Sequence, residues 1–272
     1  MKQVFRVKSG RVLVVRKPSE AEVKAFASRL LNAHSKSKAD KMKVRLMASE
    51  VLRLLKPNLS YRDLHEITGV SESVLCRYVR GSIVPGIEQA ALILSRIALS
   101  IDLSSLLKDL VEKEKSNVID LLRVLKDPYV SRLLSMLLIL ELTGKEITKI
   151  VATAEAVLPL ATMISLEFNA PIVLVKRRSY PGIQYYSTSF VRSPKDVETL
   201  YLDRDLISRK DKLLVLADVV YTGRTLEAIL EMISKSRAEV VDTIAILGLG
   251  ELWRERLEEH GVKVLTVLPF TL

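Results

Sequence analysis

The sequence predicts an α/β fold with a doubly wound parallel sheet, preceded by a mostly helical part with a short N-terminal β-hairpin. Three observations support this prediction. After residue 127, short apolar segments alternate with segments of helical apolar spacing, which is typical of β–α units in a parallel sheet. Between residues 60 and 86, short helical segments are separated by glycine-containing turns. Residues 2–17 alternate around Ser9-Gly10, which is typical of a β-hairpin.

Length and composition indicate a globular protein of one large or two ordinary domains. The elements divide the 272 residues into a hairpin plus helical domain over 1–100, a helical linker over 101–127 and an α/β domain over 128–272. No apolar run is long enough to cross a membrane, and the charged start argues against a signal peptide. The single cysteine, Cys76, excludes an internal disulfide and indicates a reducing compartment, so we expect a cytoplasmic protein.

The formal charge of +10 is unevenly distributed along the chain. Residues 1–127 hold 24 Lys and Arg against 14 Asp and Glu, whereas residues 128–272 hold 18 of each kind. A bound phosphosugar needs only local positive groups, so a separately basic half indicates a larger polyanion such as double-stranded DNA. A basic surface that serves only solubility is the alternative.

The limits of the N-terminal helices are predicted from N-capping residues and from proline and glycine residues that end helices. Ser19 is a plausible N-cap for a helix that runs to about Leu31. A polar and basic segment over 35–43 leads into a second helix, which Pro57 ends. The apolar face of that second helix consists of Val44, Met47, Val51, Leu54 and Leu55. Pro85-Gly86 makes a turn before an apolar helix over 87–99.

Residues 60–81 have the spacing of two short helices joined by a tight turn. Ser60 is placed to cap Tyr61–Thr68, Gly69 supplies a left-handed turn, and Ser71 is placed to cap Glu72–Arg80. The inward-facing set is Leu64, Ile67, Val70, Val74, Leu75 and Val79.

This segment resembles the helix-turn-helix of the lambda-repressor/Cro type, in which a Gly-Val-Ser turn and a Tyr-x-x-Gly ending recur. The resemblance implies DNA binding through the outward-facing residues of the second helix, which are Ser71, Glu72, Ser73, Arg77, Tyr78 and Arg80. Phosphate neutralisation would come from Lys41 and Lys43, together with Lys36, Lys38 and Arg45. A helical oligomerisation or packing module that uses the same turn is the alternative.

The linker and the α/β part complete the chain. Residues 101–127 predict an amphipathic, Leu-rich helix interrupted at 112–115, and a further helix covers 129–142. Predicted strands cover 147–152, 172–175, 213–216, 241–247 and 263–268, and predicted helices cover 157–168, 225–234 and 252–260. A polar, aromatic stretch over 179–196 carries no element in this prediction. In such a sheet, ligands bind at the carboxyl ends of the strands.

The most informative stretch is 213–225. The apolar run Leu213–Leu216 is typical of a central parallel strand, and Asp218 follows it. A loop around Gly223 then leads into a helix at Thr225, so free backbone N–H groups can meet an anion there. The pattern indicates a phosphorylated sugar whose hydroxyls bond to Asp218, and the missing Lys-Ser/Thr argues against a P-loop nucleotidase. An ordinary β–loop–α unit with a stray Asp is the alternative.

This stretch resembles the phosphoribosyl-pyrophosphate (PRPP) motif of type I phosphoribosyltransferases: four apolar residues, two acids, two apolar residues, two small or hydroxyl positions, Gly, any residue, then Ser or Thr. Two positions depart from it, because Ala217 replaces the first acid and Tyr221 replaces a small residue. The resemblance implies a PRPP site at Asp218, Val219, Val220, Tyr221, Thr222, Gly223, Arg224 and Thr225. Mg²⁺ is expected only as the PRPP complex, with no metal site of the protein's own.

The resemblance extends over residues 127–272 and implies further contacts. Pyrophosphate would lie against the loop of Ala154, Glu155 and Ala156 and against Lys176 or Arg177. A flexible flap would cover roughly 179–193. The glycine common in the pyrophosphate loop is missing here.

Two functions from different classes are consistent with these features. One is a transcription regulator of nucleotide metabolism genes that senses PRPP or a nucleotide, acts as a homodimer and resembles archaeal regulators with a helix-turn-helix ahead of an orotate-phosphoribosyltransferase-like domain. The other is an active phosphoribosyltransferase that joins a nucleobase to PRPP and releases pyrophosphate. Ala217 favours the regulator, because losing one charge-assisted hydrogen bond of about 1.5–3 kcal/mol weakens the hold on ribose roughly ten- to a hundred-fold.

Overall fold

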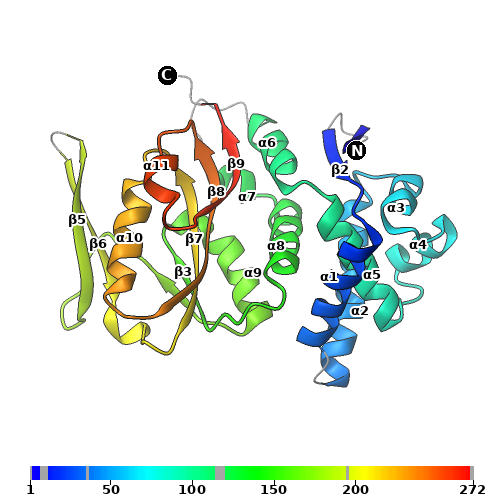
Figure 1. The fold of residues 1–272 in the computed structure, drawn as a ribbon, viewed down its shortest axis with the longest axis horizontal. Coiled ribbons are helices and arrows are strands. Elements are labelled where there is room, and N and C mark those ends of the chain that lie inside the picture. The colour runs from blue at the N-terminus through cyan, green and yellow to red at the C-terminus, as the bar shows by residue number, and fades with distance from the viewer. Residues whose placement is uncertain (1, 7–11, 35–36, 114–119, 194–195, 270–272) are drawn as a thin grey trace. The chain divides into compact units, whose positions relative to one another are not determined.

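The computed structural model describes residues 2–6, 12–34, 37–113, 120–193 and 196–269 (Figure 1). Two compact units make up the chain. The helical unit consists of Met1–Lys113 and Pro128–Gly144, and the sheet unit consists of Glu114–Asp127 and Lys145–Leu272. This division places residues 114–127 in the sheet unit and residues 128–144 in the helical unit, so it differs from the limits inferred from the sequence on both sides of residue 127. Those limits stay a prediction about domains.

The helical unit begins with an antiparallel strand pair and continues with helices. Strands β1 (Lys2–Arg6) and β2 (Val12–Arg16) pair in register, and the predicted turn at Ser9-Gly10 lies outside the described residues. The helices are α1 (Glu20–Ala33), α2 (Lys38–Leu55), α3 (Tyr61–Thr68), α4 (Glu72–Arg80), α5 (Ile87–Ser100), α6 (Leu103–Lys113) and α8 (Pro128–Leu142). Helices α2 and α5 both contact α8.

Capping residues explain where the helices begin. Ser19 and Glu22 form a capping box at the start of α1, and Ser60 and Asp63 form another at the start of α3, as the sequence predicted for both caps. Ser37 accepts a hydrogen bond from the Asp40 backbone N–H at 3.0 Å. This cap starts α2 six residues before Val44, so the predicted polar segment is helical from Lys38 onward.

Gly69 makes the turn between α3 and α4. Its φ of 71° lies in the left-handed region that disfavours larger residues. The Arg96 guanidinium donates to the Thr68 carbonyl at 2.7 Å, and a Cβ on Gly69 would lie 2.2 Å from that guanidinium. The turn therefore needs glycine for both reasons.

The predicted linker consists of two helices, and the residues between them lie outside the described part of the chain. Helix α6 belongs to the helical unit, whereas α7 (Leu121–Leu125) belongs to the sheet unit. Asp120 caps α7 by accepting a hydrogen bond from the Leu122 backbone N–H at 2.9 Å.

The sheet unit contains five parallel strands in the order β4-β3-β7-β8-β9. Their bounds are β3 (Lys149–Ala152), β4 (Ile172–Leu174), β7 (Lys212–Val220), β8 (Glu239–Leu249) and β9 (Lys263–Leu268). Helices α9 (Leu158–Phe168) and α10 (Arg224–Ser234) lie on opposite faces of the sheet (Figure 1). The doubly wound parallel sheet is thus confirmed.

The largest differences from the predicted elements are in β7, β8, the helix predicted over 252–260 and the predicted flap. Strand β7 continues to Val220 because its pairing with β8 extends to Val220↔Gly248, so Asp218 lies within the strand rather than beyond it. Strand β8 is also longer than predicted, and helix α11 covers only Arg254–Leu257. The second part of the predicted flap forms strand β5 (Tyr185–Ser193), which pairs with β6 (Asp196–Asp203), beyond the predicted flap, in an antiparallel ribbon.

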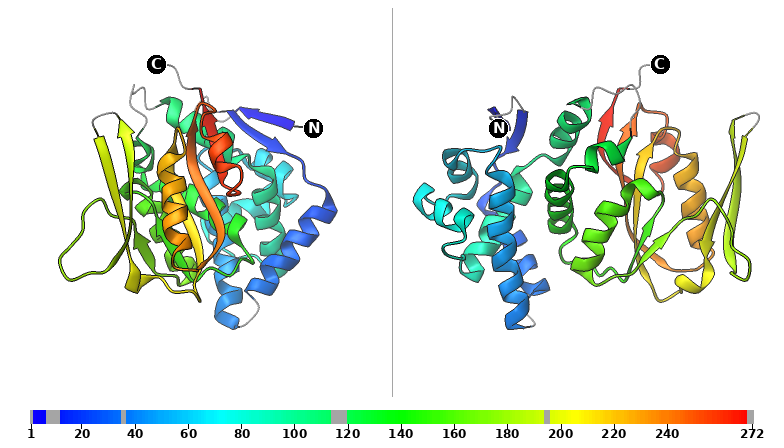
Figure 2. Two further views of the ribbon diagram at one scale, coloured as in Figure 1. Left: turned by 60° about the vertical axis from the view of Figure 1, so that its left-hand side comes forward. Right: turned by 180° about the vertical axis from the view of Figure 1, so that it is seen from behind.

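This ribbon lies beside α10, on the side away from the five-stranded sheet, in all the views of Figures 1 and 2. It is rich in β-branched, aromatic and hydroxyl residues, which suit a pleated surface. The hydroxyls of Ser189 and Thr199 are 2.9 Å apart across the two strands. Hydroxyl pairs of this kind stabilise a ribbon without the apolar alternation that signals a strand.

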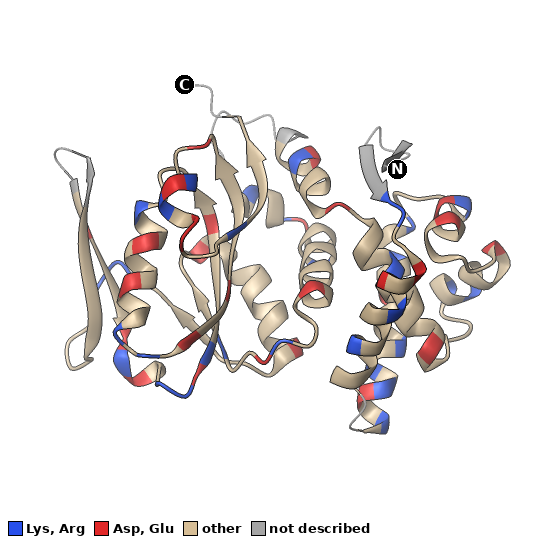
Figure 3. Cartoon of the chain, viewed as in Figure 1, with Lys and Arg blue, Asp and Glu red and all other residues tan. Residues whose placement is uncertain are grey.

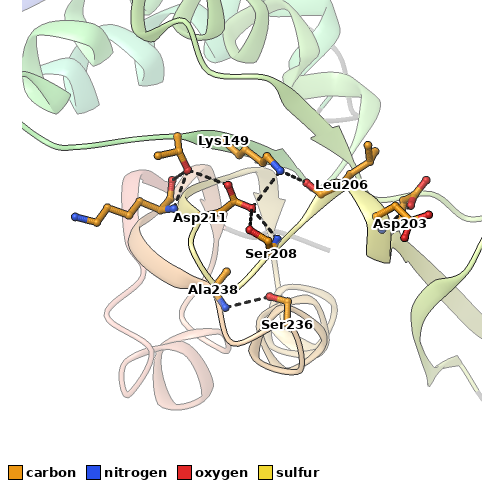
Figure 4. A network of polar contacts seen from close by, with 10 residues as sticks. Lys149, Asp203, Leu206, Ser208, Asp211, Ser236 and Ala238 are labelled. Atoms are coloured by element: carbon orange, nitrogen blue, oxygen red, sulfur yellow. Dashed lines mark hydrogen bonds and ion pairs between the residues drawn. The ribbon is translucent and has the colours of Figure 1, made fainter.

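The core of the sheet unit lies between the sheet and α10. Residues 213–216 of β7 have no exposed surface, as expected for a central parallel strand. At the amino end of β3 and β7, Lys149, Ser208 and Asp211 form a polar network (Figure 4). Among the described residues, no helix is both long enough and apolar enough to span a bilayer.

Candidate functional site

The candidate ligand site lies where the sheet reverses its winding. Strands β3 and β7 are neighbours, but the chain leaves β3 toward β4 at one edge and leaves β7 toward β8 and the other edge. Ligands of doubly wound folds bind at such a point, beyond the carboxyl ends of the strands. The Thr153 backbone N–H donates to the Leu216 carbonyl at 3.0 Å, which brings the loop after β3 beside the end of β7.

Gly223 forms the N-cap of α10 and gives the phosphate loop its shape. Its φ of 78° is in the left-handed region, and its carbonyl accepts the Glu227 backbone N–H at 2.9 Å. The first backbone N–H groups of α10 have no acceptor one turn earlier in the helix, so they are available to an anion. The predicted strand–glycine–helix arrangement is therefore present, with the helix beginning at Arg224.

A pocket of about 480 Å³ opens at this point. Its wall gathers ten of the thirteen residues predicted to bind the ligand, namely Ala154, Arg177, Asp218, Val219, Val220, Tyr221, Thr222, Gly223, Arg224 and Thr225. Residues from the loop after β3, from the end of β4 and from the β7–α10 connection thus meet around one space, although they are up to 71 positions apart in the chain.

Three predicted residues do not line this pocket. Glu155 and Ala156 lie in the 3₁₀ turn η1 (Glu155–Val157), and Glu155 is exposed. The backbone of Lys176 pairs with Tyr201 of β6, and the Lys176 ammonium lies 5.0 Å from the centre of the Tyr180 ring. From this basic segment, it is Arg177 that lines the pocket.

The two departures from the motif both lie on the pocket wall. Ala217 is 3% exposed, so the wall has a methyl group where the motif has its first acid. Tyr221 is 37% exposed, so its ring is accessible to solvent at the pocket edge and is not packed in the core. Asp218 is half-buried and remains the carboxylate of the motif.

The prediction missed Phe190 and Glu198, which come from the ribbon and also line the pocket. They are direct partners across β5 and β6, so both side chains lie on one face of the ribbon. The Glu198 carboxylate lies 3.0 Å from the Arg177 guanidinium. No motif signals these residues in the sequence, because their place at the pocket depends on a ribbon that the periodicity did not reveal.

Helix α7 packs against η1, next to the loop that follows β3. Three of its five residues, Leu121, Val124 and Leu125, are buried, and so is Val157 at the end of η1. The linker thus includes a helix that contacts a segment adjoining the pocket wall.

The helical unit has a basic and polar surface at the residues predicted to bind DNA. Ser71, Glu72, Ser73, Arg77 and Arg80 of the α4 region are exposed, as are Lys38, Lys41 and Lys43 of α2, while Lys36 lies outside the described residues. Figure 3 shows charged residues of both signs on these helices. Arg45 is half-buried and donates to the Pro85 carbonyl at 2.7 Å.

The predictions for Tyr78 and for the Ser71 cap need correction. Tyr78 is only 8% exposed, because it lies three residues after the buried Leu75 and so on the same face of α4. Ser71 occupies the N-cap position, but its side chain accepts no capping hydrogen bond, and its hydroxyl lies 3.4 Å from that of Ser73.

Comparison with known proteins identifies the family. A model described as "Phosphoribosyl transferase domain" matches residues 132–266. The chain is 34% identical over 125 residues to a hypoxanthine/guanine phosphoribosyltransferase of Methanocaldococcus infernus. The matched residues make up 45% of this chain and 66% of that protein, so the match spans just under two thirds of the relative's length. It is 31% identical over 143 residues to the Methanotorris igneus protein of the same name, covering 52% of this chain and 76% of the relative.

An adenine phosphoribosyltransferase of Photorhabdus laumondii is 29% identical over 154 residues, which cover 56% of this chain and 82% of that protein. The matched region contains all five strands of the sheet apart from the last residues of β9, and it contains every residue that lines the pocket. The chain therefore belongs to the phosphoribosyltransferase family and has the type I phosphoribosyltransferase fold.

Proposed function

We propose that this chain binds PRPP in the pocket beside Asp218 and transfers its phosphoribosyl group to a purine base. The single observation that carries the proposal is the left-handed Gly223 at the start of α10, which leaves helix N–H groups facing a pocket that also contains Asp218. The names of the relatives favour this transferase over the regulator that the sequence favoured, and they name hypoxanthine, guanine and adenine as bases.

The residues of the pocket suit the parts of PRPP. The N–H groups and hydroxyls of residues 222–225 suit the 5′-phosphate, and Asp218 suits the ribose hydroxyls. Arg177 suits the pyrophosphate. In the reaction, a bond forms from a ring nitrogen of the base to the ribose C1, the bond from C1 to the pyrophosphate oxygen breaks, and the base loses the proton from that nitrogen.

Magnesium would enter with PRPP and neutralise part of its charge. Asp218 and Glu198 place carboxylate oxygens on the pocket wall, which are ligands that Mg²⁺ prefers. These residues therefore fit a metal that arrives with the substrate.

The test is pyrophosphate release when the protein is mixed with PRPP, Mg²⁺ and each of adenine, guanine and hypoxanthine. Turnover with one base, reduced at least ten-fold in Asp218→Asn, is the expected result. Asp205→Asn, an exposed site on the 3₁₀ turn η2 (Arg204–Leu206), is the matched control. Binding of PRPP without turnover on any base would overturn the transferase proposal and leave a binding protein.

A second function, DNA binding by the helical unit, is favoured by a separate observation. Helices α3 and α4 are joined by the left-handed Gly69 and contact one another, and the outer residues of α4 are exposed. This arrangement suits a helix-turn-helix, and the net charge of residues 1–127 suits a polyanion. On this proposal a homodimer in the cytoplasm binds a two-fold symmetric DNA site near genes of nucleotide metabolism. Binding of PRPP or a nucleotide changes its affinity for that site and so regulates transcription.

The salt dependence of binding to duplex DNA tests the second function. We expect the logarithm of the DNA association constant to fall linearly with the logarithm of salt concentration. We also expect the protein to prefer DNA from upstream of its own gene over random duplex DNA. Absence of binding at low salt would overturn it without affecting the transferase proposal.

A further inference from the structure

An ion pair closes one side of the candidate PRPP pocket. The Arg177 guanidinium, just beyond β4, lies 3.0 Å from the carboxylate of Glu198 on β6, and both residues line the pocket. The Glu198 side chain is 11% exposed, whereas that of Arg177 is 57% exposed. The carboxylate is therefore fixed in the wall, and the arginine is the partner that solvent and ligands can reach.

This pair matters because the pocket is proposed to hold a polyanion. A pyrophosphate group that took Arg177 would compete with Glu198 for the guanidinium, and it would lie close to that carboxylate. Breaking an ion pair whose carboxylate is mostly buried costs free energy that the ligand must offset. A 5′-phosphate on the Thr222–Thr225 loop has no such conflict, because the backbone N–H groups of the α10 start hold it instead.

We propose that Glu198 is a specificity-determining residue that competes with the ligand for Arg177. This inference rests on the proposed function, since it assumes that the pocket binds the parts of PRPP. Glu198 then disfavours a metal-free pyrophosphate group and leaves binding of a ribose 5-phosphate group unchanged. The pocket would accept nucleoside monophosphates freely and pyrophosphate-bearing ligands mainly with a divalent cation.

Glu198→Gln tests this competition, because it removes the charge and keeps the shape. Binding is measured by calorimetry on the full chain in EDTA, with inorganic pyrophosphate and ribose 5-phosphate as separate probes. A charge-assisted hydrogen bond of about 1.5–3 kcal/mol predicts that pyrophosphate binds roughly ten- to a hundred-fold more tightly to the variant. Ribose 5-phosphate should bind equally to both proteins. Unchanged or weaker pyrophosphate binding would overturn the inference.

Two further variants make the result specific. Glu146→Gln breaks an exposed pair with Lys212 whose two side-chain atoms are 2.6 Å apart and should change neither affinity. In the Arg177→Gln background, Glu198→Gln should give a much smaller gain, because no guanidinium remains to be released. An equal gain in both backgrounds would contradict competition and indicate charge repulsion alone.

The probes also separate this inference from the proposed function. If the wild-type protein binds ribose 5-phosphate and only the Glu198 effect is missing, this inference fails and the ligand site stands. If neither probe binds to the wild type or to the variant at millimolar concentration, the proposed ligand site itself fails.

Discussion

Gly223 and Leu257 lie so close together that a Cβ on the glycine would be 2.9 Å from the Leu257 Cγ. Leu257 is fully buried at the end of α11, and Gly223 starts α10, so two segments meet at the phosphate loop. Gly223 therefore serves twice: it adopts the left-handed conformation and it allows the two helices to approach.

Gly223→Ala should destabilise the sheet unit and impair ligand binding. The left-handed conformation costs an alanine about 1–2 kcal/mol, and crowding against Leu257 adds about 1–3 kcal/mol. Gly182→Ala is the matched control, because Gly182 also has a positive φ, of 84°, but no atom lies within 4 Å of its added Cβ. Urea unfolding should show the larger loss for Gly223→Ala. Equal losses would mean that Leu257 moves aside without penalty.

Thr222 and Thr225 should be needed for phosphate binding. Both line the pocket and are half-buried, and a hydrogen bond to a charged group contributes about 1.5–3 kcal/mol. Replacing both with alanine should lower the affinity for ribose 5-phosphate by at least ten-fold, as measured by calorimetry, and leave DNA affinity unchanged. Thr162→Ala, at an exposed position of α9, should alter neither. Unaltered ribose 5-phosphate affinity in the double variant would mean that the phosphate binds elsewhere.

Arg77 and Arg80 should contribute to DNA binding through their charge. Both are exposed on α4, so replacing both with alanine should lower duplex affinity and reduce the slope of log K against log salt concentration by up to about 2. Arg132→Ala, whose side chain is 54% exposed on α8, is the control for simple loss of positive charge. If Arg132→Ala reduced the slope as much as the double variant does, DNA would be attracted non-specifically to the whole helical unit.

Local sequence signals sufficed where short-range chemistry determines the structure. Ser19 and Ser60 each start a helix through a capping box, and Gly69 ends a helix with positive φ, so these boundaries could be predicted residue by residue. The apolar run before Asp218 likewise identified the central strand and the pocket beside it.

Features that depend on contacts between distant segments could not be predicted in this way. The β5–β6 ribbon is stabilised by pairing across the two strands and by packing on α10, and its hydroxyl-rich sequence lacks the expected alternation. Glu198 reaches the pocket only because of that ribbon. Tyr78 was predicted to point outward because it was left out of the inward-facing apolar set, but its side chain is buried on the same face of α4 as Leu75.

The network around Asp211 should make the stability of the sheet unit depend on pH. Its carboxylate accepts hydrogen bonds from the Ser208 backbone N–H at 2.6 Å and the Ser208 hydroxyl at 2.9 Å, and it lies 3.1 Å from the Lys149 ammonium (Figure 4). Burial alone would raise the pKa of Asp211, but these hydrogen bonds and the nearby ammonium outweigh burial and hold the pKa below its usual value.

Because the folded-state pKa is the lower one, the stabilisation is complete above the usual pKa of an unfolded aspartate, near 4. It is lost as the pH falls through that value toward the folded-state pKa. Asp211→Asn should therefore reduce the free energy of unfolding by about 1–3 kcal/mol at pH 7, and the difference from wild type should shrink as the pH falls below about 4 toward the folded-state pKa. Urea unfolding at pH 7, 5 and 3 measures this change, with Asp205→Asn at an exposed position as the control. A difference that stayed constant across the series would show that the substituted amide destabilises the protein through its shape and hydrogen-bonding pattern and that the charge of Asp211 contributes little.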